Sequence, residues 1–386
     1  MDHESARRPP GPSPSRPAGS LHNVITADVR RAVWDAARQA AAASELPAPI
    51  PPASQPGHGT QPDDASTLRP VPAALGGGPG RYASTLPYLL AAPGAAPAQV
   101  AAILAARLAR LDWIAEAEAT AATGHLTVTV TGEVLSALAV RIPQAPDCAR
   151  SRILRGLRVP AAACADLAAA PSWPQAHAAL IAEVTTRLAA KAGADMVPER
   201  RPPASRPAPA PGSPVAAALA DVGSDAVRYA LISRSDGWRD EGGPELPVRY
   251  HLDNPAYAVR YAHAHAASTL RQAADLGLGA GPAAEFVPCL LTHPAERALL
   301  DALSWLPERV AWAARIRRPA EFARYLEELA GAYQDCRESR PALPYGGRRA
   351  PPDQPDIRAR LWLVTASGTA IAAGLGLLGI SAPDRL

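Results

Sequence analysis

The stretch DNPAYAVRYAHAHAASTLRQA, residues 253–273, decides the fold of the C-terminal half of this chain. Asn254 is a suitable N-cap for a helix, and Pro255 fits the first helical position, where a missing N–H is harmless. Aromatic and imidazole side chains recur every four residues and so share one helix face: Tyr257, Tyr261 and His265. Basic side chains lie on a second face: Arg260, His263 and Arg271. The stretch therefore predicts a long helix with an aromatic face beside a basic one.

After this stretch the helical pattern continues. Three further segments have the pattern of helices: residues 293–306, 307–316 and 319–336. An apolar stripe at helical spacing marks the last of them: Phe322, Tyr325, Leu326, Leu329, Ala330 and Tyr333. Residues 361–380 lack any charge, which meets the length test for a membrane span. Because Gly374, Gly376 and Gly379 indicate a helix end followed by a turn, we expect a buried C-terminal helix and no membrane partner. Residues 214–386 are thus predicted to form an all-α helical bundle.

The N-terminal third has the pattern of a small α+β domain, which we place at residues 23–142. The composition of residues 1–22 is that of a disordered tail without a secretory signal. A helix is predicted from Pro97, where apolar side chains follow at helical spacing. In residues 125–131, HLTVTVT, apolar side chains alternate with threonine, which predicts a strand with one buried face.

Residues 143–213 give a weaker pattern. One helix is predicted in SWPQAHAALIAEVTTRLAAKAG, residues 172–193. The next segment, PERRPPASRPAPAPGSP, residues 198–214, is typical of a stiff, extended linker. The expected fold class is therefore a small α+β N-terminal domain joined by a Pro-rich linker to an all-α C-terminal helical bundle.

We predict no catalytic residue, metal site or cofactor from the motifs. Gly76–Gly80 lacks the Gly-Lys-Ser/Thr ending of a phosphate-binding loop. The four cysteines are too far apart for a zinc knuckle and are typical of a protein in the reducing cytoplasm: Cys148, Cys164, Cys289 and Cys336. Lys191 is the only lysine beside 38 arginines, and the net charge is only +3, so charge alone does not indicate a nucleic-acid partner.

Four motifs in the C-terminal half occur in the order found in a known family: DVGSDAVRYALISR (221–234), DNPAYAVRYAHAHAASTL (253–270), residues 293–333, and ARLWLVTASGTAIAAGLGLLGISAPDRL (359–386). Together they resemble the C-terminal anticodon-binding (DALR) domain of arginyl-tRNA synthetase. Residues 80–131, which begin GRYASTLPYLLAA, resemble the N-terminal additional domain of the same enzyme, which contacts the outer corner of the tRNA. The resemblance implies a tRNA partner, with arginine tRNA as the expected one.

The resemblance also implies a class I catalytic domain between these two parts, and its motifs are absent here. The family carries a HIGH-type motif for ATP and a lysine-bearing KMSKS-type loop. About seventy residues occupy the interval 143–213, which is too short for a doubly wound sheet built from units of about thirty residues. If the helix predicted at 172–193 is a relic of the family helix that lies behind the HIGH motif, Ser172–Gln175 occupies the position of that motif. ATP and Mg would be expected only with a catalytic core, so we expect no ligase activity.

Several positions depart from the family pattern. The family's YAHAR is YAHAH here, so His265 replaces a permanent cation with a side chain that is mostly neutral at pH 7. Its GDYATN is GRYAST, so Thr85 replaces an asparagine that touches the tRNA elbow. Where the family ends in methionine, this chain has Leu386. These changes predict weaker reading of the anticodon bases.

The residues expected to contact tRNA combine the basic positions with aromatic ones that could stack on bases: Tyr82, Thr85, Arg228, Arg234, Tyr257, Arg260, Tyr261, His263, His265, Arg271, Arg358 and Arg360. For Tyr257 and Tyr261 a core role is the alternative, and for the arginines it is simple solvation of a helical bundle.

Two kinds of function follow. The first is a tRNA-binding protein that presents or sequesters tRNA for a tRNA-modifying or tRNA-using enzyme. The alternatives are a protein-interaction scaffold that has lost RNA binding, or the tRNA-binding part of a ligase split between two chains.

Overall fold

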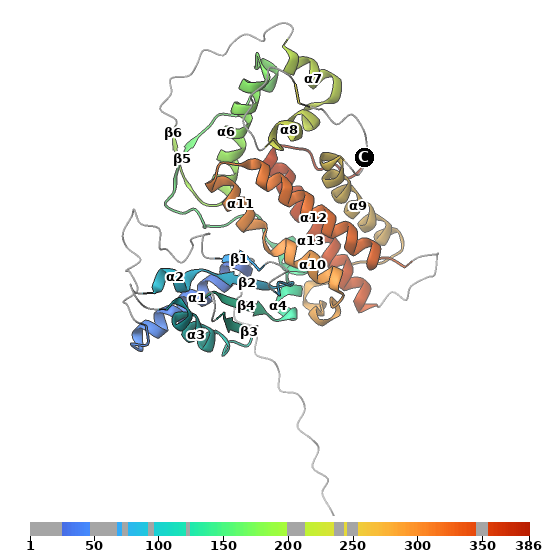
Figure 1. Cartoon of the computed structure of the whole chain (residues 1–386). Helices are drawn as coiled ribbons and strands as arrows, with labels where there is room; N and C mark the ends of the chain where they lie inside the picture. Colours follow the sequence, from blue (N-terminus) through green and yellow to red (C-terminus); the bar gives the residue numbers. More distant parts are fainter. Residues whose placement is uncertain are drawn as a thin grey trace, which may run out of the picture.

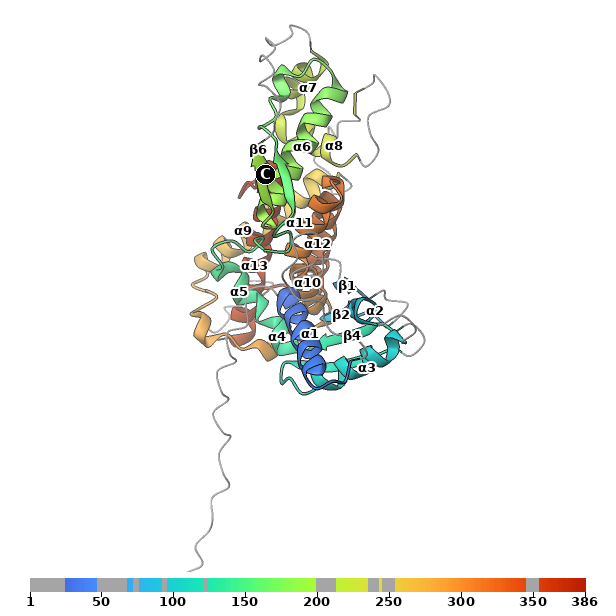
Figure 2. The same ribbon diagram turned by 90° about the vertical axis from the view of Figure 1, so that its left-hand side faces the viewer.

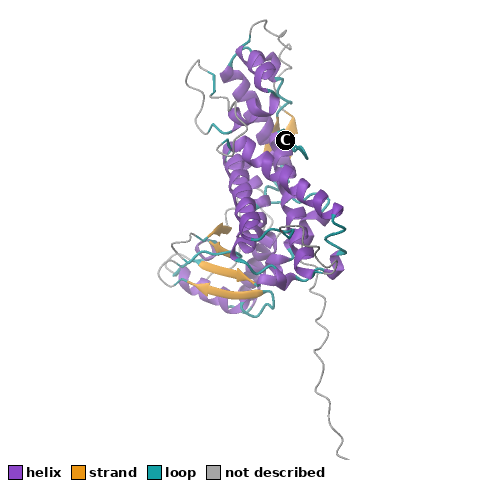
Figure 3. Cartoon of the chain, turned by 90° about the vertical axis from the view of Figure 1, so that its right-hand side faces the viewer, coloured by secondary structure: helices purple, strands orange, loops and turns teal. Residues whose placement is uncertain are grey.

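The computed structural model describes residues 25–46, 68–71, 76–91, 96–120, 124–198, 213–234, 243–244, 254–344 and 354–386. The predicted tail at residues 1–22 and the Pro-rich segment at 199–212 lie outside them. Figure 1 shows a sheet-containing part at the bottom, beneath a set of long helices. Figure 3 shows strands in two separate places, one in this lower part and one higher up beside the helices.

The N-terminal part contains an antiparallel sheet of four strands in the order β1, β2, β4, β3. The strands are β1 (Leu68–Pro70), β2 (Arg81–Ser84), β3 (Ile114–Ala119) and β4 (Leu126–Val130). Its helices are α1 (Ile25–Ala42), α2 (Leu86–Leu90), α3 (Pro97–Leu108), α4 (Gly132–Ser136) and α5 (Leu138–Gln144). Leu126, Val128 and Val130 are buried, as the alternating pattern predicted, and α3 packs against β3 and β4.

The segment from 143 to 198 contains more structure than the sequence indicated. Besides the expected helix, α6 (Trp173–Lys191), it forms β5 (Arg158–Ala161) and β6 (Asp195–Pro198), which pair in parallel. A short 3₁₀ helix, η2 (Leu167–Ala169), precedes α6. Strand, helix and parallel strand make one βαβ unit, whereas a doubly wound sheet requires several.

The βαβ unit is packed and does not serve as a linker over residues 158–198. Leu180, Val184 and Leu188 of α6 are fully buried, and α6 contacts α8 and α11 of the C-terminal part. The strands were missed because each has only four residues and contains a proline, which weakens the strand pattern.

The C-terminal part is all helical. Its helices are α7 (Pro214–Val222), α8 (Ser224–Ile232), α9 (Pro255–Asp275), α10 (Pro294–Ser304), α11 (Leu306–Arg315), α12 (Pro319–Ser339) and α13 (Pro355–Leu378), with two 3₁₀ turns, η3 (Ala283–Glu285) and η4 (Pro288–Leu290). The apolar stripe predicted in α12 is buried along its whole length. These helices confirm the predicted helix-rich C-terminal fold.

Helix α13 lies at the centre and packs against α5, α9 and α12. Within the described residues it is the one helix long and apolar enough to cross a membrane, but 67% of its most apolar window is buried inside the protein. The expected helix end is misplaced, because Gly374 and Gly376 lie inside α13 and only Gly379, with φ of 71°, ends it. A Cβ on Gly374 would stand 2.4 Å from Leu326 Cδ2, so this glycine permits close packing of α13 on α12.

The N-terminal part is docked directly on the helical bundle, as Figure 2 shows from the side. Buried Arg30 of α1 forms an ion pair with buried Glu308 of α11. The Tyr82 hydroxyl of β2 donates a hydrogen bond to Ser304 Oγ at 3.0 Å. The Gly80 N–H donates to Asp301 Oδ1 at 2.8 Å. The buried apolar residues of both parts belong to one continuous core.

Candidate nucleic-acid interface

Helix α9 forms as its sequence predicted. Asn254 Oδ1 accepts hydrogen bonds from the N–H groups of Ala256, at 3.1 Å, and Tyr257, at 3.5 Å, which caps the first turn. Val259, Ala262 and Ala266 are buried in the bundle, which fixes the rotation of the helix. The aromatic and basic faces of α9 are therefore both half-exposed.

The aromatic face forms a continuous row that extends onto α12. The ring centroids of Tyr257 and Tyr261 are 5.8 Å apart with nearly parallel planes, and Tyr261 lies 6.1 Å from His265. His265 Nδ1 is 2.9 Å from the Tyr333 hydroxyl, and the two rings meet edge to face. Tyr257 and Tyr261 are neither core residues nor fully exposed, so part of each ring faces solvent.

The charge state of this row is set by burial. Burial, together with the nearby cation Arg337, lowers the pKa of His265 from 6.5 to about 4. His265 is therefore neutral at pH 7, as its sequence position suggested. The permanent cation here is Arg337, which donates to the Tyr261 hydroxyl at 3.2 Å and lies 5.8 Å from the centroid of its ring.

Beside the row lies a cavity of about 310 Å³ between α9, α12 and α13. Its lining includes both apolar and cationic side chains: His265, Tyr333, Arg337, Arg340, Leu363 and Arg360. A mixed cavity of this size is typical of sites that hold a small, partly polar group.

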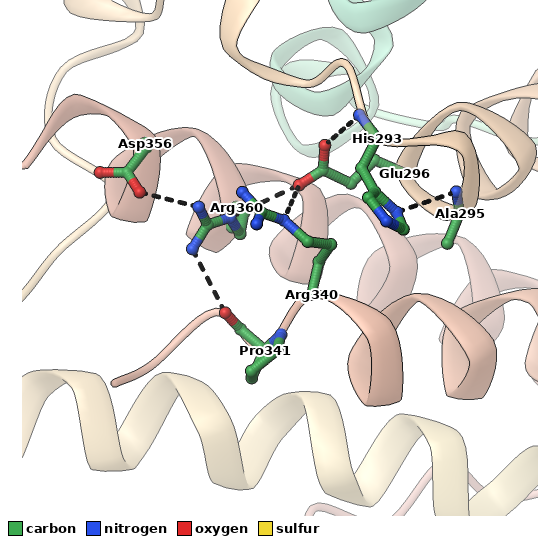
Figure 4. Close-up of polar contacts among 7 residues, drawn as sticks. All are labelled: His293, Ala295, Glu296, Arg340, Pro341, Asp356 and Arg360. Atoms are coloured by element: carbon green, nitrogen blue, oxygen red, sulfur yellow. Dashed lines mark hydrogen bonds and ion pairs between the residues drawn. The ribbon is translucent and has the colours of Figure 1, made fainter. Parts of the chain in front are cut away.

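Two arginines that line this cavity, Arg340 and Arg360, lie against Glu296, which is only 1% exposed (Figure 4). Its Oε2 accepts from the His293 N–H at 3.0 Å, which completes a capping box at the start of α10. Arg360 Nε lies 3.4 Å from Glu296 Oε1, while its Nη2 donates to Asp356 Oδ2 at 2.7 Å. Arg340 approaches the same Oε1 at 4.0 Å.

The basic face of α9 is partly covered by the last residues of the described chain. Arg260 Nη2 donates to Ser381 Oγ at 3.3 Å and pairs with Asp225 at 3.5 Å. His263 Nδ1 is 3.1 Å from the Pro383 carbonyl oxygen, and Arg271 Nη2 donates to the Asp384 carbonyl at 3.0 Å. Residues 381–384 therefore occupy part of the hydrogen-bonding capacity of this face.

The other expected contact residues are dispersed. Tyr82 is fully buried against Trp305, with ring centroids 5.3 Å apart, and Arg228 is buried in an ion pair with Glu183 of α6 at 2.6 Å. Neither side chain presents a surface to RNA in this structure, because their partners come from elements distant in sequence. Thr85 is half-buried at the start of α2, and Arg234 is exposed after α8.

Arg358 is partly exposed and pairs with Glu285 at 2.7 Å. The sequence reasoning did not single out Tyr333, Arg337 and Arg340 as site residues. Tyr333 and Arg337 are four residues apart on α12 and so lie one turn apart on the same face, a spacing that could have identified them from the sequence.

Residues 259–386 match the DALR anticodon binding domain family. The C-terminal part is also similar to two arginine–tRNA ligases: 44% identity over 165 residues with that of Frankia alni and 43% over 167 residues with that of Clavibacter sepedonicus. Residues 259–386 thus form a DALR domain. Each alignment covers 43% of this chain but only 29% of the ligase, so this chain spans less than a third of its relatives' length.

Among solved structures, the arginyl-tRNA synthetase of Thermus thermophilus is 26% identical over 54% of this chain and 32% of that chain. Its TM-score is 0.31, which is too low to support an assignment of the whole fold.

Proposed function

We propose that this protein binds tRNA through its DALR domain and does not aminoacylate it. The observation that carries the proposal is the row of half-exposed rings on α9, which continues to the buried Tyr333 of α12 and borders the cavity. Apart from Tyr257, this row lies within the residues that match the anticodon-binding family. Proteins that recognise unpaired RNA bases stack them on such rings and hold the flanking backbone with cations. Arginine tRNA is the expected ligand, because the relatives are arginine–tRNA ligases.

The absence of ligase activity is part of the proposal and rests on the sequence. The segment from 143 to 213 has neither a HIGH-type motif nor a KMSKS-type loop, and Lys191 is the only lysine of the chain. Lys191 pairs with Asp147 at 2.6 Å, so its ammonium group already has a carboxylate partner. We infer that the protein presents or sequesters tRNA in the cytoplasm, for a partner enzyme that modifies or uses it.

A neutral His265 limits the affinity of this site. The corresponding family position is an arginine, and a cation there would add an ion pair to a phosphate or a hydrogen bond to a base. We expect tRNA binding to be weak and steeply dependent on salt. His265→Arg should strengthen it.

An electrophoretic shift with arginine tRNA and with total tRNA, each at two salt concentrations, tests the proposal. Tyr261→Ala should weaken binding roughly tenfold or more, because stacking contributes about 1–3 kcal/mol for each base. Tyr261→Phe keeps the ring and should retain binding. Trp312→Ala removes another exposed aromatic ring, on α11, and should leave affinity unchanged.

Three outcomes contradict parts of the proposal. If the chain binds no tRNA at low salt, the tRNA-binding function is wrong. The second candidate, a protein-interaction scaffold, then remains; it is favoured by the internal partners of Arg228, Arg260 and Arg358. Arginyl-tRNA formation by the purified chain would refute the catalytically inactive assignment, and formation only with a second polypeptide would indicate a split ligase.

A further inference from the structure

A second basic surface lies outside the DALR domain, in the segment that leads into β5. It contains four arginines within nine residues: Arg150, Arg152, Arg155 and Arg158. All four side chains are exposed. We call residues 150–158 the arginine loop. In Figure 1, β5 lies on the left of α6, while α9 lies on the right of the bundle, so the two segments that carry these arginines lie on different sides in this view.

The backbone of the arginine loop is fixed on the C-terminal end of α6. The Ser151 N–H donates to the Lys191 carbonyl at 3.1 Å, and the Leu154 N–H donates to the Ala192 carbonyl at 3.0 Å. Ile153 and Leu154 are buried, which anchors the middle of the loop. A Cβ on Gly193 would stand 2.8 Å from Ser151 O, so loop and helix end are in direct backbone contact. The arginines therefore project from an ordered base.

The arginines of the arginine loop have fewer carboxylate partners than several other arginines of the protein. In the described part of the chain none of the four forms an ion pair, whereas Arg260, Arg358 and Arg360 each do. Two acidic residues lie near the arginine loop. Asp147, close in the chain, pairs with Lys191 instead. Asp195 of β6 is the strand neighbour of Arg158 but forms no ion pair with it.

The dipole at the C-terminal end of α6 favours nearby cations, but its effect fades within one turn. It accounts for one or two basic residues and leaves most of this cluster unexplained. An exposed, unpaired guanidinium can bind a phosphate through two parallel hydrogen bonds. Several of them on a fixed backbone are suited to the regular spacing of phosphates along a nucleic acid.

We propose that the arginine loop is a phosphate-backbone contact for RNA, separate from the aromatic row of the DALR domain. The proposal rests on the proposed tRNA-binding function and adds a site to it. Binding at this loop is independent of base sequence, because guanidinium contacts to phosphate carry no base information. The loop therefore contributes affinity and salt dependence, whereas the aromatic row contributes selectivity.

The test compares two triple variants of the full chain. In the first, Arg150, Arg152 and Arg155 are replaced by Gln. In the control, three exposed arginines elsewhere are replaced by Gln: Arg38, Arg318 and Arg324. Both variants lose the same formal charge. Dissociation constants for arginine tRNA are measured over a series of salt concentrations, and circular dichroism checks that each variant is folded.

We expect the loop variant to bind on the order of 100-fold more weakly at about 0.1 M salt, and the slope of log K against log salt to fall by about 2 to 3. The control should keep both values. Replacement of the same three loop residues by Lys preserves the cations and should restore most of the affinity and slope. The relative loss should be the same for an unrelated tRNA, since the contact reads no bases.

The outcomes separate this inference from the function on which it rests. If the unaltered chain binds no tRNA at any salt concentration, the proposed function fails and the inference fails with it. If the unaltered chain binds tRNA and the loop variant keeps its affinity and slope, only the inference is overturned. The inference is also overturned if the control loses as much as the loop variant, because overall charge is then sufficient. Binding of the loop to anionic vesicles with unchanged tRNA affinity would assign it to a membrane surface instead.

Discussion

Removing Arg30 should test how firmly the N-terminal part is attached to the helical bundle. Arg30 and Glu308 pair across the contact between α1 and α11, and their side chains are 2% and 6% exposed. Arg30→Met leaves the Glu308 carboxylate buried without its cation, which costs about 3–5 kcal/mol in the free energy of unfolding. The loss should be measured by urea unfolding, followed by circular dichroism and by tryptophan fluorescence.

The matched control is Arg38→Met on the same helix. Arg38 pairs with Asp35, but the two side chains are 53% and 46% exposed, so this change should cost less than about 1 kcal/mol. In the double variant Arg30→Met with Glu308→Leu, apolar side chains replace both partners, and most of the lost stability should return. Glu308→Leu alone leaves the buried Arg30 without its anion at a similar cost, so the magnitude of the coupling energy should exceed about 3 kcal/mol.

Equal losses in the free energy of unfolding for Arg30→Met and Arg38→Met would show that the buried ion pair is unimportant. A double variant less stable than both single variants would show the same. The single Arg30→Met variant should also separate the unfolding of the two parts, because the contact between them loses a buried ion pair. Coincident transitions at unchanged stability would show that apolar packing alone holds the parts together.

Three other predictions concern local features of the fold. Gly374→Ala should lower the free energy of unfolding by about 1–2 kcal/mol, because its Cβ would press on buried Leu326. Gly376→Ala should raise the free energy of unfolding by about 0.5–1 kcal/mol, because there is open space around this helical position. Urea unfolding measures both changes. Burial raises the pKa of Asp301 from 3.8 to about 6. Between these two pH values the native state therefore keeps a proton that the unfolded chain has lost. Its contribution to stability should be full below about pH 4 and should decline by about 3 kcal/mol as the pH rises through 6. Asp301→Asn should remove this part of the pH dependence of thermal unfolding. Asn254→Ala removes the cap of α9 and should cost about 1 kcal/mol, while Asn254→Asp, which keeps the acceptor, should cost much less; an equal loss for both would show that the cap is unimportant.

The local helix signals in the sequence were sufficient for much of the C-terminal fold. Helix α9 begins where Asn254 and Pro255 indicated, and the stripe in α12 is buried as its spacing required. The strand β4 followed from strict alternation of apolar residues and threonine. These features are predictable because capping and periodicity depend on residues close together in the chain.

The candidate site was only partly predictable. The aromatic row on α9 lies on one face because four-residue spacing determines it, and the neutral state of His265 agrees with its identity as histidine. The cavity could not be predicted, since its other walls come from α12 and α13. Arg228 was expected at the surface and is buried, because its carboxylate partner, Glu183, comes from a helix 45 positions earlier in the chain.

The sequence by itself determined the long helices of the C-terminal part, which face of each is apolar, and that this part has the motifs of an anticodon-binding domain. Tertiary structure decided which arginines are free. The α9 arginines meet residues 381–384 and Asp225, whereas those of the arginine loop meet no described carboxylate. The physical reason is that periodicity acts within a few residues, while the pairing of charges depends on which distant surfaces the shared core brings together.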